Sequence, residues 1–212
     1  MNLIAIETST EMCAVALLNK ELKQVAPQKH AELVLGYLQA LLDRQGLRKT
    51  DIDGIVFGQG PGAFTGVRIA TSIVQGLALA LDVPVLPVST LKNLAHQIWF
   101  RDTEQQQRIL VANDARMGEV YWAAFETKNE QLIRLSADAI CAPEALNTDG
   151  FDVCVGSAFK SMVSVSEQVE VCDDMLPDAI TLLDIAEVEF SSRAQNIIDI
   201  QPSYIREKVV FS

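Results

Sequence analysis

The sequence contains few histidines and cysteines, and none of them is clustered. The two histidines, His30 and His96, are far apart, and the cysteines at positions 13, 141, 154 and 172 form no Cys-x-x-Cys pair. Zinc sites need closely spaced ligands, and disulfide frameworks need an oxidising compartment. We therefore expect reduced, mostly buried thiols and no metal site.

Basic residues are too few to balance the acidic ones, and the formal net charge is −11. Residues 1–100 hold eight acidic and eight basic residues, whereas residues 101–212 hold twenty acidic and nine basic residues. Lysine and arginine drive binding to polyphosphates through counterion release. The composition therefore disfavours strong, direct binding of nucleic acid by this chain alone.

Long apolar runs are also absent. No stretch of about 18 uninterrupted apolar residues occurs, so we expect no membrane-spanning segment. The start, MNLIAIETST, lacks the basic and apolar regions of a secretory signal. With 49% hydrophobic and 21% charged residues, the composition is typical of a folded globular protein, and we expect it in the cytoplasm.

Apolar periodicity divides the chain into two halves, separated by the polar stretch RDTEQQQ at 101–107. In the first half we expect strands at 1–7, 12–18, 22–26, 54–57 and 83–88, and helices at about 28–42, 63–81 and 89–100. In the second half we expect strands at 108–113, 118–126, 131–140, 152–155 and 169–172, and a helix at 177–189. The repeated βββαβα order predicts an α/β protein with two similar lobes, residues 1–100 and 101–212.

A glycine-rich stretch, GQGPGAFTGVRIA at 58–70, lies between an expected strand and an expected helix. It matches the dinucleotide fingerprint, but the acidic residue that should end the next strand, Asp82, precedes that strand instead. The phosphate-binding motif Gly-x-x-x-x-Gly-Lys-Ser/Thr is absent from the sequence. We therefore favour a structural turn, in which glycine tolerates unusual dihedral angles and Pro61 stiffens the connection.

The helix expected at 63–81 has a single charged residue, Arg68, and is apolar nearly all round. Small residues recur every four positions along two lines: Gly62, Gly66 and Ala70, and Ser72, Gly76 and Ala80. Such ridges allow a second helix to approach closely. One side should cover the sheet of its own lobe, and we predict that a partner chain covers the other. Burial inside one larger core is the alternative.

Four segments occur in order along the chain: IAIETST at 4–10, GQGPGAFTGVRIA at 58–70, QGLALALDVPVLPVSTL at 75–91 and DARMGEVYWA at 114–123. Together they resemble the TsaB (YeaZ) family, the non-catalytic member of the bacterial machinery that makes threonylcarbamoyladenosine on tRNA. PSYIR at 202–206 resembles the ending of that family. The resemblance implies a two-lobed fold of the actin, sugar kinase and Hsp70 (ASKHA) type, in agreement with the repeated order of elements.

The resemblance also implies kinship with TsaD, the catalytic paralogue, which carries a His-x-x-x-His metal pair just after the strand equivalent to 83–88. Thr90 and Leu94 stand at those positions here, and neither side chain can replace an imidazole ligand. The turn ETSTE at 7–11 has no glycine and carries two carboxylates that would repel a phosphate. We therefore expect no catalytic residue, no metal and no cofactor.

Two further features have more than one interpretation. His30 opens the first long helix, where a cap or surface role is favoured over catalysis. Asp114 and Arg116 could form a phosphate-facing turn, although an aspartate that organises its own hairpin is the simpler interpretation.

The implied partner is TsaD, with the ATPase TsaE as a further partner and tRNA reached only through the complex. Without TsaD, two copies of the chain could pair as an isologous dimer. We predict a docking surface on the two long helices of the first lobe, formed by Leu33, Tyr37, Ala40, Leu41, Arg68, Thr71, Ser72, Gln75, Gly76 and Leu79. The loop that organises the second helix is predicted at Gly60, Pro61, Gly62 and Gly66.

The implied function is to bind and activate TsaD while TsaD transfers threonylcarbamoyl to adenosine 37 of tRNAs that read ANN codons. An ATP-dependent small-molecule kinase of the same fold is one alternative. A purely structural homodimer without an enzyme partner is another.

Overall fold

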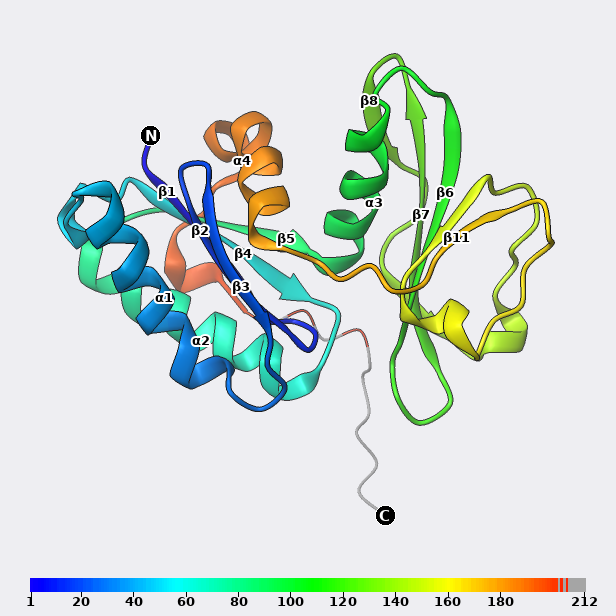
Figure 1. Cartoon of the computed structure of the whole chain (residues 1–212), viewed down its shortest axis with the longest axis horizontal. Coiled ribbons are helices and arrows are strands. Elements are labelled where there is room, and N and C mark those ends of the chain that lie inside the picture. The colour runs from blue at the N-terminus through cyan, green and yellow to red at the C-terminus, as the bar shows by residue number, and fades with distance from the viewer. Residues whose placement is uncertain (202, 204, 206–212) are drawn as a thin grey trace. The chain divides into compact units, whose positions relative to one another are not determined.

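Figure 1 shows the computed structural model of the chain, which describes residues 1–201, 203 and 205. The chain forms two compact units. The first comprises Met1–Asn93 and Pro177–Ser203, and the second includes Leu94–Leu176. The PSYIR ending predicted at 202–206 lies largely outside the described residues.

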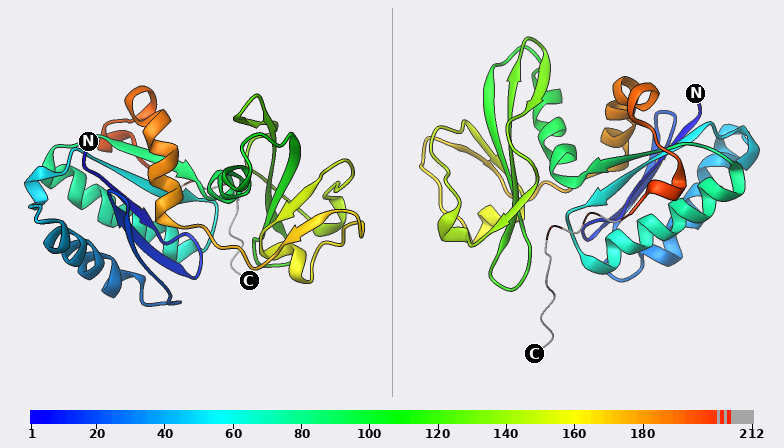
Figure 2. Two further views of the ribbon diagram at one scale, coloured as in Figure 1. Left: turned by 45° about the horizontal axis from the view of Figure 1, so that its top comes forward. Right: turned by 180° about the vertical axis from the view of Figure 1, so that it is seen from behind.

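A five-stranded sheet in the order β3-β2-β1-β4-β5 forms the centre of the first unit. Its strands are β1 (Leu3–Glu7), β2 (Met12–Leu17), β3 (Lys20–Val25), β4 (Gly54–Gly60) and β5 (Val85–Ser89). β1 is antiparallel to β2 and parallel to β4, and β4 is parallel to β5. Figure 1 and the turned views of Figure 2 show α1 (His30–Gln45) and α2 (Phe64–Leu81) on one face, and α4 (Ala179–Arg193) on the other.

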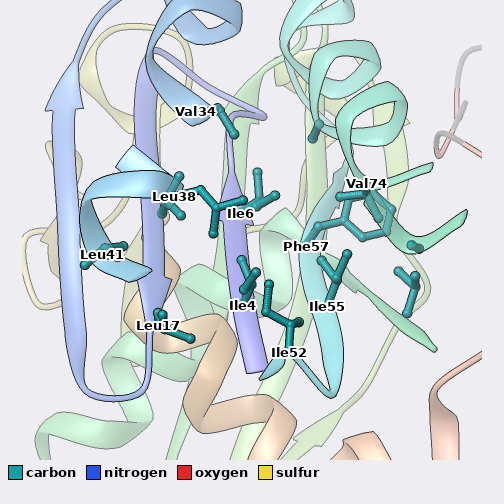
Figure 3. Packing of buried hydrophobic residues seen from close by; sticks show 14 of the residues in the cluster. Ile4, Ile6, Leu17, Val34, Leu38, Leu41, Ile52, Ile55, Phe57 and Val74 are labelled. Atoms are coloured by element: carbon teal, nitrogen blue, oxygen red, sulfur yellow. The ribbon is translucent and has the colours of Figure 1, made fainter. Parts of the chain in front are cut away.

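The central strands are buried on both faces, and their side chains alternate between two apolar layers. Ile4 and Ile6 of β1 pack under α1 and α2, where Leu38 is part of the same core (Figure 3). Ala5, between them, packs on the opposite side with Phe190 of α4. This alternation follows the period of two that a strand imposes on its side chains.

The sheet of the second unit repeats that topology. Its strands are β6 (Gln107–Asp114), β7 (Val120–Lys128), β8 (Gln131–Arg134), β9 (Ala139–Cys141), β10 (Val153–Val155) and β11 (Glu170–Cys172). The order is β11-β10-β6-β7-β8, with β9 paired to β7, and β6 is antiparallel to β7 and parallel to β10. The prediction of an α/β protein with two lobes of the same strand order is confirmed.

The second unit differs from the predicted repeat in two details. Where the first unit has α1 and α2, the second has the short 3-10 turns Pro143–Ala145 and Ser157–Lys160. The strand expected at 131–140 is divided into β8 and β9. The division lies at Ser136, whose hydroxyl accepts a hydrogen bond from the Ala124 amide and whose own amide bonds the Ala124 carbonyl.

The two units do not follow the sequence-based division into residues 1–100 and 101–212. Helix α3 (Thr90–Arg101) passes from the first unit into the second at Asn93 and Leu94. Helix α4 belongs to the first unit, because its apolar side covers the free face of the first sheet. The physical reason is that this sheet is apolar on both faces and therefore needs a helical layer on each side.

Among the described residues, α2 is the helix that is long and apolar enough to cross a membrane, judged by length and composition alone. Core helices of globular proteins meet the same criteria. One side of α2 contributes Val67, Ala70 and Val74 to the buried layer of the first unit.

Candidate functional site: an exposed face of helices α1 and α2

The glycine-rich loop is seated on the turn between β1 and β2. The Ala63 amide donates to the Ser9 carbonyl (2.7 Å), and the Thr8 hydroxyl donates to the Gly66 carbonyl (2.8 Å). A Cβ atom at Gly62 would overlap the Ser9 carbonyl oxygen, and one at Gly66 would overlap that of Thr8. The glycines therefore allow close backbone packing within the chain, as the structural interpretation of this motif predicts.

Gly60 and Pro61 have roles in the same turn. Gly60 has a φ of +100°, in the region that favours glycine, and Pro61 is joined to it by a cis peptide bond. Asp82, considered above as a dinucleotide contact, ends α2 in a left-handed conformation and precedes β5. The loop thus orients the start of α2.

Helix α2 has two sides of different exposure. Gly66, Val67, Ala70, Thr71, Val74 and Ala78 are buried. Exposed residues follow the helical repeat on the outer side: Thr65, Arg68, Ser72, Gln75, Gly76 and Leu79. Leu79 is 75% exposed. A long helix with a single charged residue therefore presents a stripe of mostly small or uncharged polar residues, together with Arg68 and Leu79, to the outside of its unit.

Helix α1 lies beside this stripe and forms a groove with it. The groove has a volume of about 440 Å³ and is lined by Ala31, Leu35, Phe64, Thr65, Arg68, Ile69, Ser72 and Ile73. Leu35 and Phe64 are each more than half exposed, and the Arg68 guanidinium lies 3.6 Å from the centre of the Phe64 ring. We call these groove residues, together with Gln75, Gly76 and Leu79, the α1–α2 face.

Two glycines on these helices have no internal packing role. A Cβ at Gly36 or at Gly76 would meet no atom within 4 Å. Glycine inside a helix costs about 1 kcal/mol relative to alanine. Gly76 is therefore not required for contacts within the chain. The absence of a side chain there would let a partner protein approach the backbone of α2 closely.

The structure separates the predicted docking residues into three groups. Arg68, Ser72, Gln75, Gly76 and Leu79 are exposed on the α1–α2 face. Leu33, Tyr37 and Ala40 are partly buried; the Tyr37 hydroxyl donates to Gln24 at 3.3 Å.

Leu41 and Thr71 need correction. Leu41 is fully buried in the first core, on the same helical side as Val34 and Leu38. Thr71 is 3% exposed, and its hydroxyl donates to the Val67 carbonyl one turn earlier (2.9 Å). Both residues support the helices from within and lie outside the α1–α2 face.

The sequence-based prediction missed Leu35 and Phe64, the most exposed of the large apolar side chains that line the groove. Leu35 could have been found, because Ala31 and Leu35 are one turn apart and lie directly beside the core positions Val34 and Leu38 on the helix surface. Phe64 gave no such signal. Its exposure depends on the loop, which sets the direction in which α2 begins.

Thr90 and Leu94, where the resemblance implies metal histidines in TsaD, have structural roles in this chain. The Thr90 hydroxyl donates to the Ser9 hydroxyl oxygen (2.7 Å), and Leu94 is fully buried. His30 is also buried, at 5% exposure, and its Nε2 lies 3.2 Å from the Met12 carbonyl oxygen. His30 therefore stands at the start of the helix, as predicted, but it is an internal anchor and not a surface residue.

Asp114 organises the turn between β6 and β7. Its carboxylate accepts hydrogen bonds from the Arg116 amide (2.7 Å) and from the Arg116 guanidinium (3.0 Å). Arg116, Met117 and Gly118 all have positive φ values. These contacts agree with the simpler interpretation of this pair, an aspartate that orders its own hairpin.

Comparison with known proteins finds TsaD and TsaB, two proteins whose names refer to threonylcarbamoyl modification of tRNA. Residues 19–196 match the model of the family described as TsaD, tRNA N6-adenosine threonylcarbamoyltransferase. The chain is 31% identical to the tRNA threonylcarbamoyladenosine biosynthesis protein TsaB of Haemophilus influenzae, over 100% of this chain and 96% of that protein. It is 33% identical to TsaB of Escherichia coli, over 100% of this chain and 97% of that protein.

Solved structures agree with the sequence comparisons. YeaZ from Pseudomonas aeruginosa has a TM-score of 0.84 and 34% identity, covering 96% of this chain and 99% of that one. A second structure, of an uncharacterized protein from the same organism with similarity to peptidase YEAZ, has a TM-score of 0.86 and 35% identity, covering 97% and 99%. With identity above 30% over its whole length, this chain belongs to the TsaB (YeaZ) family of tRNA threonylcarbamoyladenosine biosynthesis proteins.

Proposed function

We propose that this chain is a non-catalytic subunit that binds TsaD in the cytoplasm. It activates TsaD for threonylcarbamoyl transfer to adenosine 37 of tRNAs that read ANN codons. The names of its relatives and the match to the TsaD family model support a role in this pathway. The exposed α1–α2 face carries the more specific proposal of a docking subunit.

The chemistry of the described residues supports a non-catalytic role. Thr90 and Leu94 stand where the paralogue is expected to carry its metal ligands, and both are buried in structural contacts. Thr8 and Ser9 of the first turn are fully buried and hydrogen-bonded to the loop and to Thr90. The chain would contribute through binding, and tRNA would be contacted through the assembled complex.

Binding at the α1–α2 face would activate a partner by shifting its conformational equilibrium. Apolar burial changes the conformation of TsaD only if the docked surface favours one of its states over another. A stable complex needs about 800 Å² of surface on each partner, so the groove alone is too small and the whole outer stripe of α2 is required. The same face would pair two copies of the chain when TsaD is absent, and TsaE would join the TsaD complex as a further subunit.

Gly76→Glu tests this proposal, because the substitution places a charge at the smooth centre of the α2 stripe. The structure has open space at Gly76, so the variant should fold. Burying an unpaired carboxylate against TsaD should cost about 3 kcal/mol or more, which weakens binding by at least about 100-fold. Titration calorimetry with purified TsaD measures the affinity, and reconstituted tRNA modification measures the activation.

The matched control is Ser191→Glu, which adds the same charge at an exposed position of α4. The control should bind TsaD and support modification as the unmodified chain does. Undiminished affinity and modification with Gly76→Glu would refute the α1–α2 face as the docking surface. Failure of the unmodified chain to bind TsaD at all would refute the proposed function itself.

A further inference from the structure

A buried carboxyl group lies beneath the turn that holds the start of α2. Glu7, the last residue of β1, is fully buried and packs against Gly58, where a Cβ atom would overlap the carboxyl group. Its Oε1 accepts a hydrogen bond from the Ser9 amide (2.6 Å). Its Oε2 has no hydrogen-bond partner among the described residues. A group of this kind is costly to ionise in place.

The charges around Glu7 make ionisation still less favourable. Burial raises the pKa of Glu7 to about 7, and the negative charge of Asp178 adds to the rise, against the lowering effect of the hydrogen bonds from Ser9 and Thr8. Asp178 forms an ion pair with Lys23 (3.2 Å), and Lys23 also contacts Glu21.

Residues of β2, β4 and α3 lie around the Glu7 carboxyl group. From β2 the neighbouring titratable group is the Cys13 thiol, whose own pKa is raised to about 11 by burial and by Glu7. Gly58 of β4 has no side chain, and Thr90 of α3 is uncharged. No cation is among the groups that shift the pKa of Glu7, so only hydrogen bonds favour its charged form.

The turn above Glu7 is tied to two helices. Ser9 receives the Ala63 amide at the entry to α2, and Thr8 donates to Gly66 in the first turn of α2. The Ser9 hydroxyl oxygen receives the Thr90 hydroxyl at the start of α3. Because Gly62 and Gly66 touch the backbone oxygens of this turn, the turn cannot move outward without moving the start of α2.

We propose that proton binding at Glu7 controls how firmly the N-terminal end of α2 is held, and with it the Phe64 end of the α1–α2 face. Protonated Glu7 is neutral and fits the closed turn. Loss of the proton leaves a carboxylate that gains by reaching water, which requires the turn at 8–10 to open and the bonds to Ala63 and Gly66 to weaken. The consequence for docking rests on the proposed function, but the switch itself is a property of the isolated chain.

An NMR titration of the isolated chain between about pH 3.5 and pH 8.5 tests the switch. The carboxyl carbon of Glu7 and the amides of Ser9, Ala63 and Gly66 should shift with one shared midpoint near pH 7. Glu7→Gln, a neutral isostere, should abolish the shifts at Ala63 and Gly66. This variant also separates Glu7 from the two histidines, His30 and His96, which are unchanged in it.

Asp178→Asn provides a second variant that leaves Glu7 in place. Asparagine can still cap α4 as Asp178 does through the Thr181 amide, and removal of the negative charge should lower the shared midpoint. The matched control, Asp184→Asn on the same helix, should leave it unchanged.

Two outcomes would overturn the proposal: a Glu7 midpoint near the ordinary 4.5, or a response confined to Ser9 while Ala63 and Gly66 stay still. Since no partner is present in the titration, these outcomes are independent of whether TsaD binds. With TsaD added, a decline in affinity with rising pH that Glu7→Gln removes would connect the switch to docking.

Discussion

At the scale of single residues, the ionisation of Glu7 has a calculable effect on folding. Its pKa rises from an ordinary 4.5 to about 7 in the folded chain. Between these values the folded state binds more protons than the unfolded state, so stability falls as pH rises. The loss starts near pH 4.5, is complete above pH 7, and amounts to about 3 kcal/mol at 1.36 kcal/mol per pKa unit.

Glu7→Gln should remove this loss. Urea unfolding of both proteins at several pH values measures it, and the unmodified chain should lose about 3 kcal/mol more than the variant between pH 4.5 and pH 8. Comparing the two proteins cancels contributions from other groups, such as Asp184, whose pKa is raised by burial and by Glu187 and Asp178. Parallel pH profiles for the two proteins would contradict the assignment.

The sequence could not reveal the state of Glu7. In the turn ETSTE, Glu7 and Glu11 look equivalent, and both were expected to repel a phosphate. In the structure Glu11 is exposed, whereas Glu7 points into a space left by the missing side chain of Gly58. That space depends on the pairing of β1 with β4, which brings together residues about fifty positions apart.

At the scale of elements, two glycines of α2 have opposite surroundings. Alanine at Gly66 would overlap the Thr8 carbonyl oxygen, whereas alanine at Gly76 would enter open space. We expect Gly66→Ala to destabilise the chain by about 2 kcal/mol, as overpacking against backbone does. Gly76→Ala should stabilise it by about 0.5–1 kcal/mol through helix propensity.

Denaturant unfolding of the two variants under one condition checks the pair, and each serves as the control of the other. Equal effects of the same sign would show that the loop does not fix the start of α2 by close packing. If Gly76→Ala also weakens binding to TsaD while it stabilises the fold, the methyl group obstructs close helix approach at the α1–α2 face.

Local sequence patterns predicted nearly every element of the first unit, and they predicted sides of helices less well. The strands and helices have strong periodicity and clear ends, such as Gly46, which caps α1 in a left-handed conformation. Leu41 was nevertheless assigned to the docking surface, although it shares a helical side with Val34 and Leu38. Thr71 was misplaced because a polar side chain suggests exposure, and its bond to Val67 is formed only in the folded helix.

At the scale of the whole molecule, local sequence patterns could not predict that α4 packs on the first unit. The helix itself was expected, but its destination depends on which sheet face remains uncovered. Leu182 and Phe190 of α4 pack against Leu3 and Val56 of the first sheet. The apolar residues of α4 indicate only that the helix needs an apolar surface, and both sheets offer one.

A chain that ends at Leu176 should therefore fail to form a native first unit. Without α4, the sheet face that contains Leu3, Val56 and Leu86 is left open to water. We expect the truncated chain to bind a hydrophobic dye such as ANS and to lose cooperative thermal unfolding, which circular dichroism follows. A chain ending at Gln201 keeps α4 and is the control; native-like, dye-free behaviour of both would contradict this account.

The first unit is built from two segments of the chain that are separated by the second unit, and this order affects folding during synthesis on the ribosome. Although β1 emerges first, the layer that closes its second side is made last, after all strands of the other sheet have been translated. Until α4 has been made, one apolar face of the first sheet is exposed to water, and such exposed apolar surface promotes chaperone binding or aggregation. The synthesis of α4 therefore sets the earliest moment at which the first unit can be completed.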